Sequence, residues 1–242
     1  MTTSVPGVLS RNGLRKFPVV TAAVFAVTAA VNIAQLLAPH LLHTLERTPA
    51  GLHGQWWRTG TALLVQDGGV PGTLSNLAFL LVVGVAAEQV LTRRQWLVSY
   101  LATGLLSELV GYAWQPTGGG NSIAVCGLAG ALALWRTGGP LPVWAPQAVL
   151  LWCGAVGATA GNGSTAVTVI AVGAAAAVGA AVRGATEKGL PAARCWGLAV
   201  VATGIALSAL RNIHGAALLI GIVIAAVPLL AGRAARSGEQ TG

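Results

Sequence analysis

The chain has 242 residues, of which 55% are hydrophobic and only 8% are charged. This excludes an ordinary soluble domain, in which about a quarter of the residues are charged. A formal net charge of +8 would suggest a nucleic-acid partner in a soluble protein. Here the basic residues stand at the ends of apolar segments, where they act as topology signals. The composition therefore predicts an all-α polytopic membrane protein that binds no nucleic acid.

The predicted elements begin with a tail, residues 1–16, and a first span at 17–38 that is too long for a signal peptide and lacks a clear cleavage site. A long loop, 39–72, follows. Since a spanning helix needs about 20 mostly apolar residues, seven further spans are expected before a second tail at 233–242. They are 73–92, 95–114, 121–136, 143–161, 165–183, 194–210 and 213–231. About eight transmembrane helices thus form one membrane domain, residues 17–232.

The basic loop residues fix the expected orientation. If all eight segments span, most of them fall on one side, and only Arg47, Arg58 and Arg211 fall on the other. The positive-inside rule then makes both termini cytoplasmic in a multi-pass protein of the cell membrane. The majority side carries Arg11, Arg15, Lys16, Arg93, Arg94, Arg136, Arg183, Lys188, Arg194, Arg233 and Arg236.

The outer loop 39–72 contains two adjacent tryptophans and an arginine, Trp56, Trp57 and Arg58. This composition suits an interfacial loop or a short helix at the level of the lipid headgroups, a role that requires no catalytic function.

The three cysteines, Cys126, Cys153 and Cys195, fall inside apolar runs, and their number and spacing do not fit a metal site. We expect them to be small apolar packing residues, and we expect no metal or cofactor.

Polar residues inside spans are costly, so each is a candidate for function. Glu88 lies five residues from Arg93, which favours a local charge pair or a contact with water. Glu108 could pair with an arginine or line a cavity, and nothing near it in the sequence decides between these. The remaining candidates are Asn76, Ser122 and His214.

Topology places Asn76, Ser122 and His214 at the outer ends of three different spans, and therefore at one depth. The span that begins at Ser122 has only about 14 residues, or ~21 Å of helix against ~30 Å of hydrocarbon. Ser122 should then lie at the floor of a depression, which is reached through a flexible loop at 117–120.

A serine and a histidine at one depth can perform nucleophilic catalysis, because a neighbouring base activates the hydroxyl. Asn76 and backbone N–H groups at the start of the short span could stabilise the oxyanion. Gly130 and Gly221 lie on the same helix faces as Ser122 and His214 and would allow close helix contact. Taken singly, each polar residue also has a structural reading: a backbone-bonded serine, an interfacial histidine, a capping asparagine.

Together these motifs resemble the rhomboid family of intramembrane serine proteases. Gly120 and Ser122 followed by Gly127 and Gly130 are similar to the family's nucleophile motif, and His214 with Gly221 is similar to its histidine motif. Trp57-Arg58 resembles a pair in the family's first outer loop, and Asn76 with Glu88 resembles its second core helix. The resemblance implies a six-helix core with two extra spans. It also implies a Ser122–His214 dyad, Asn76 at the oxyanion site, a structural Trp57-Arg58 pair and membrane-anchored protein substrates near the outer leaflet.

Two departures from the family pattern bear on activity. Many members carry a histidine four residues before the asparagine, where this chain has Gly72, and a glycine after the nucleophile, where it has Ile123. These departures keep one alternative open, an inactive rhomboid-like pseudoprotease that binds transmembrane helices. A second alternative, independent of them, is a small transporter.

Overall fold

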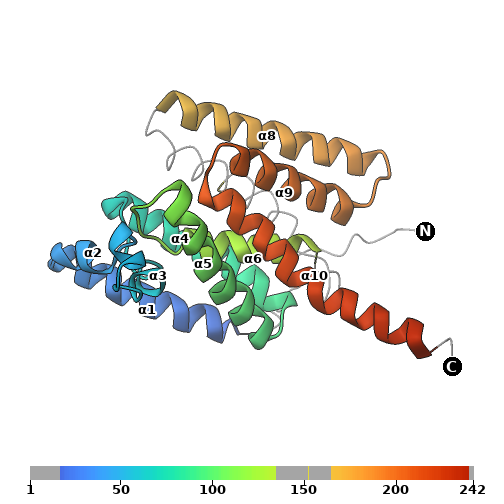
Figure 1. Cartoon of the computed structure of the whole chain (residues 1–242). Helices are drawn as coiled ribbons and strands as arrows, with labels where there is room; N and C mark the ends of the chain where they lie inside the picture. The colour runs from blue at the N-terminus through green and yellow to red at the C-terminus, as the bar shows by residue number, and fades with distance from the viewer. Residues whose placement is uncertain (1–16, 135–151, 153–164, 240–242) are drawn as a thin grey trace.

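The computed structural model describes residues 17–134, 152 and 165–239, and within these ranges its regular secondary structure is helical apart from one isolated antiparallel bridge (Figure 1). The prediction of an all-α fold is therefore confirmed. The helices are α1 (Val19–Leu37), α2 (His40–Leu45), a 3-10 helix η1 (Pro49–Leu52), α3 (Arg58–Thr61), α4 (Gly69–Val90), α5 (Arg93–Trp114), α6 (Ser122–Leu134), α8 (Thr165–Glu187), α9 (Ala192–Ala209) and α10 (Ile213–Glu239).

The helix bounds follow the predicted spans, but they do not confirm the count of eight. By length and composition, α1 and α4 are the helices in the described ranges that could cross a membrane, and shorter apolar helices occupy Ser122–Leu134, Arg194–Ala209 and Ile213–Val227. The predicted span 143–161 lies outside the described residues except for Trp152, whose ring stacks on Phe79.

The helix that contains the last predicted span extends into the predicted C-terminal tail, 233–242. Helix α10 continues to Glu239, well beyond the expected end at 231. The segment after Leu230 is rich in alanine and arginine, which are among the strongest helix formers, so no local signal ends the helix there.

The first helix has its polar face inside the bundle. Thr28, Asn32 and Gln35 of α1 are buried, whereas Val27 and Ile33 are exposed. An exposed apolar face and a buried polar face are expected where lipid, and not water, surrounds the helix.

Helix α6 forms the centre of the bundle, with α4, α5, α9 and α10 against it (Figure 1). All residues from Ser122 to Leu132 are buried, Cys126 among them. A Cβ atom at Gly130 would collide with the backbone carbonyl of Leu218, and one at Gly221 would collide with that of Gly127. The predicted close contact between these two helices is confirmed, and it depends on glycine at both positions.

Glu88 has a different partner from the predicted one. Its carboxylate accepts hydrogen bonds from the Val20 and Thr21 backbone N–H groups, at 3.0 and 2.9 Å, and from the Thr21 hydroxyl at 2.9 Å. Of the two predicted roles, the charge pair with Arg93 is therefore wrong. Because the first N–H groups of a helix lack partners within it, a carboxylate there both satisfies them and favours the helix dipole.

Candidate active site

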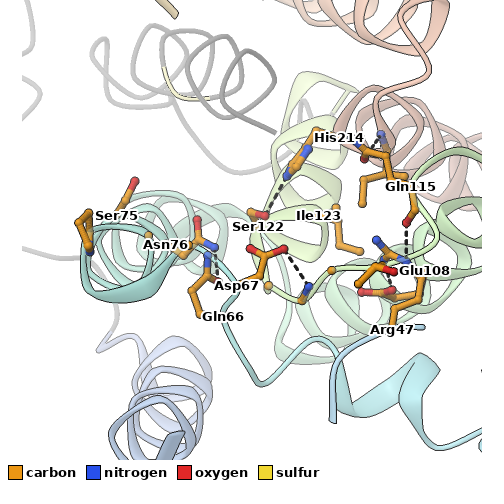
Figure 2. A pocket seen from close by; sticks show the side chains of 18 residues that line it. Arg47, Gln66, Asp67, Ser75, Asn76, Glu108, Gln115, Ser122, Ile123 and His214 are labelled. Atoms are coloured by element: carbon orange, nitrogen blue, oxygen red, sulfur yellow. Dashed lines mark hydrogen bonds and ion pairs between the residues drawn. The ribbon is translucent and has the colours of Figure 1, made fainter. Parts of the chain in front are cut away.

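Ser122 and His214 are joined by a hydrogen bond of 2.9 Å between Oγ and Nε2 (Figure 2). Ser122 is the first residue of α6 and His214 is the second residue of α10. Both side chains are buried, and the two residues are 92 positions apart in the chain. The structure thus brings the two predicted residues together at the distance that a serine and its base require.

Asn212 fixes the orientation of the His214 ring. Its Oδ1 atom lies 2.9 Å from the His214 backbone N and 2.8 Å from Nδ1. Since a backbone N–H can only donate, the side-chain atom that it contacts must be the acceptor oxygen, and Nδ1 must then carry a proton. In the neutral ring, Nε2 is left as an acceptor facing the Ser122 hydroxyl. This tautomer can take the serine proton.

Sequence reasoning missed Asn212. It directly precedes α10 and accepts from the second helical N–H, which is the geometry of an N-cap residue. The available signal was an asparagine directly before the expected helix start, followed two residues later by the histidine. The preceding residue, Arg211, has a φ of 54°, so a left-handed turn between α9 and α10 sets the position of this cap.

A pocket of about 780 Å³ opens beside the dyad. It is lined by residues from the first outer loop, α4, α5, the 117–120 loop, α6 and α10, Ser122 and His214 among them. The depression predicted at Ser122 is therefore present. Its wall includes charged and amide side chains, so a polar segment of a bound chain would find partners there.

Asn76 faces this pocket and is paired with another amide. Its Nδ2 atom donates to Oε1 of Gln66 over 2.7 Å, and both side chains are buried (Figure 2). An amide NH₂ carries two hydrogens, so this bond leaves Asn76 one further N–H. Gln66 was not among the predicted site residues.

The loop before Ser122 was expected to be flexible, but hydrogen bonds hold it. Gly118 exchanges two backbone hydrogen bonds with Arg47, at 2.9 and 3.1 Å, and the Gly120 N–H donates to Ala62 O at 2.9 Å. Gly120 has a φ of 159°, and a Cβ there would lie 2.9 Å from Gln66 Oε1. A side chain at position 120 would therefore displace the amide group of Gln66.

Asp67 forms part of the same attachment, because its Oδ2 atom accepts the Gly119 N–H at 3.2 Å. Protein atoms around the carboxyl group remove part of its hydration, and this raises the pKa of Asp67 above its usual 3.8, although the Gly119 N–H opposes the shift. The ionised form is thus the costlier one at this position.

Glu108 both pairs with an arginine and lines the cavity. Its carboxylate binds the Arg47 guanidinium in a buried ion pair, and both residues contribute to the pocket wall. Arg47 Nε also donates to Gln115 O at 2.9 Å. The pair connects the outer loop to α5 beside the site.

Arg58 makes hydrogen bonds within the outer loop, which agrees with the structural role expected for the Trp57-Arg58 pair. Its Nη1 atom donates to the carbonyl oxygens of His43 and Glu46, at 2.8 and 2.9 Å. The neighbouring Trp56 and Trp57 side chains are exposed. Arg58 therefore holds α2 against α3 while the tryptophans face outward.

Ile123 and Gly72, the two departures from the family pattern, line different parts of the pocket. Ile123 is buried and lines the pocket on the side of Glu108 and Gln115, away from the Ser122–His214 bond (Figure 2). Gly72 stands on the first turns of α4, and the Gln66 side chain fills the space beside it.

The structure is thus a bundle of helices with exposed apolar residues and a buried, hydrogen-bonded Ser–His pair beside a pocket. Residues 53–232 match the family model described as Rhomboid domain. The chain therefore belongs to the rhomboid family, whose members are typically intramembrane serine proteases. Comparisons with curated proteins and with solved structures gave no significant match.

Proposed function

We propose that this protein is an intramembrane serine protease that cleaves membrane-anchored proteins near the outer leaflet, with Ser122 as nucleophile and His214 as base. The observation that carries the proposal is the 2.9 Å bond between Ser122 Oγ and His214 Nε2, in a ring whose other nitrogen is committed to Asn212. A histidine with a purely structural role would not need its acceptor nitrogen to face a serine that lines a pocket.

In the proposed reaction, Ser122 Oγ attacks the substrate carbonyl carbon while its proton passes to His214 Nε2. The negative charge then forms on the former carbonyl oxygen, where Asn76 and backbone N–H groups at the start of α6 are the available donors. His214 next protonates the leaving amine as the peptide C–N bond breaks. Water then hydrolyses the acyl-enzyme. His214 Nε2 accepts a proton from the attacking water molecule and returns it to Ser122 Oγ as the acyl bond breaks.

The decisive experiment is cleavage of a single-span reporter in liposomes by the purified protein. Wild type should produce two fragments, and Ser122→Ala and His214→Ala should each reduce the rate to background. Labelling with a fluorophosphonate should follow the same pattern, because it requires an activated serine. Equal labelling of all three proteins would refute the proposal.

The rival is a pseudoprotease that binds transmembrane helices without cutting them, and Gly72 is the observation that favours it. A member that lacks one oxyanion donor could keep the fold and the pocket while losing turnover. This reading predicts that the wild-type protein retains the reporter in a stable complex, and that Ser122→Ala binds it equally well.

The proposed reaction also requires the dyad to face the outer side of the cell membrane, with both termini in the cytoplasm. Glycosylation sites inserted before α1 and in the loop before α3 would test this. Modification is expected only in the loop, and modification of the N-terminal tail would reverse the proposed topology.

A further inference from the structure

We infer that Gln66 supplies the second side-chain donor of the oxyanion site, in the space that Gly72 leaves open. This rests on the proposed protease function and adds to it a residue that the family motif does not contain. Gln66 would act together with Asn76, so that two primary amides in place of an amide and an imidazole stabilise the developing charge.

The first support is the location of the Gln66 side chain. A Cβ built on Gly72 would lie 3.2 Å from Gln66 Nε2, with the Cγ and Cδ atoms at 3.7 and 3.9 Å. The amide of Gln66 therefore occupies the volume into which a larger side chain at position 72 would extend. Gln66 and Gly72 both line the pocket that contains Ser122.

The second support is that the Gln66 backbone is held from both sides. Gln35 of α1 accepts the Gln66 N–H at Oε1 over 2.8 Å and donates its Nε2 to the Gln66 carbonyl over 2.6 Å. These two bonds fix both the peptide of Gln66 and the amide orientation of Gln35. The Gln66 side chain therefore extends from a fixed backbone, which reduces the reorganisation needed when charge develops, and low reorganisation favours electrostatic stabilisation.

The third support is that the amide groups of Asn76 and Gln66 retain N–H hydrogens that can be donated to a substrate oxygen. Oε1 of Gln66 accepts from Asn76 at 2.7 Å, whereas Nε2 makes no hydrogen bond with the described residues. Gln66 is nevertheless buried, with 7% of its surface exposed. Asn76 keeps one N–H and Gln66 keeps two, and a Cβ on Gly120, two residues before the nucleophile, would lie within 3.2 Å of atoms from both amides. Of the atoms near Gly120, Asn76 Nδ2 is a donor and Gln66 Oε1 is an acceptor, whereas Gln66 Nε2 with its two hydrogens lies beside Gly72, in the wall of the pocket that contains Ser122.

The test is steady-state cleavage of the reporter by Gln66 variants. Since one oxyanion donor contributes about 10²–10³-fold in rate, Gln66→Ala should lower kcat by about a hundredfold with little change in KM. The unfolding temperature in detergent should fall by no more than the loss of one hydrogen bond to Asn76 accounts for, because the two bonds to Gln35 involve only the backbone of residue 66. A kcat within threefold of wild type would overturn the inference.

Two further variants separate a donor from a residue that only orients Asn76. Gln66→Glu keeps the acceptor for Asn76 but replaces the donor by a negative charge, so it should be at least as slow as Gln66→Ala. If it is as fast as wild type, Gln66 only positions Asn76 and the inference is wrong. In a Gln66→Ala background, Gly72→His should restore kcat at least tenfold, whereas in wild type it should slow the enzyme because the imidazole meets Gln66. Absence of rescue would overturn the inference.

Failure of the inference is distinguishable from failure of the proposed function. If cleavage persists in Ser122→Ala, or wild type does not cleave, the proposed function fails and this inference fails with it. If cleavage depends on Ser122 and is insensitive to Gln66, only this inference fails.

Discussion

Replacing Asn212 separates stability from catalysis, because a single oxygen of its side chain makes two hydrogen bonds with different roles. The bond to the His214 backbone N–H caps α10, and the bond to Nδ1 holds the imidazole. Loss of an N-cap costs about 1 kcal/mol of stability. Loss of a neutral hydrogen bond costs about 1 kcal/mol, which corresponds to roughly a fivefold lower kcat if it is lost from the transition state.

Three variants divide these contributions. Asn212→Ala should lower both the unfolding temperature and kcat. Asn212→Ser keeps a capping oxygen, which serves as well as asparagine in that role, but is too short to reach the ring. It should therefore unfold at the same temperature as wild type, with about a fivefold lower kcat. Asn212→Asp keeps both acceptors and should retain most of the activity.

The assays are reporter cleavage in liposomes and thermal unfolding in detergent, on the same preparations. Fluorophosphonate labelling rates provide a second measure of serine activation and should fall in parallel with kcat. If Asn212→Ser cleaves within twofold of wild type while His214→Ala is inactive, Asn212 does not orient the ring and the reasoning is refuted.

Three further predictions concern the surroundings of the site. Gly130→Ala should destabilise the protein by about 1–3 kcal/mol, because its methyl group meets a carbonyl of α10; an unchanged unfolding temperature would contradict this. Glu108→Ala should cost about 3–5 kcal/mol by leaving Arg47 buried without its partner, and the double variant Arg47→Met/Glu108→Leu should be less destabilised than the single one. Because the folded-state pKa of Asp67 is raised, its contribution to stability should be present below about pH 4 and decline as pH rises through that folded pKa. Asp67→Asn should not show this decline, and parallel stability–pH curves for the two proteins would count against it.

The sequence predicted the helical class and the Ser122–His214 pairing because these depend on span number and topology. Two polar residues that each begin a span from the outer side must meet at one depth whenever the intervening spans preserve parity. The glycine contacts between α6 and α10 were predictable for a similar reason, since helical periodicity places Gly130 and Gly221 on known faces.

The residues that escaped prediction act through tertiary contacts. Gln66 lies in a loop, and its backbone is bonded to α1 while its side chain is bonded to α4. Glu88 seemed closest to Arg93 along the chain, yet folding places it under the first turn of α1. The loop before Ser122 looked flexible because it is rich in glycine, whereas its backbone groups are bonded to Arg47 and Ala62.

The buried polar face of α1 has a consequence for how this protein is made. Asn32 and Gln35 have their partners, Leu64 O and Gln66, in a loop that is synthesised after the helix itself. Until that loop arrives, these amides enter the hydrocarbon unsatisfied, at a cost of several kcal/mol for each group. The first helix should therefore be held by the insertion machinery until its loop emerges. A chain arrested before residue 64 should remain crosslinkable to that machinery, whereas one arrested after α4 should be released into lipid.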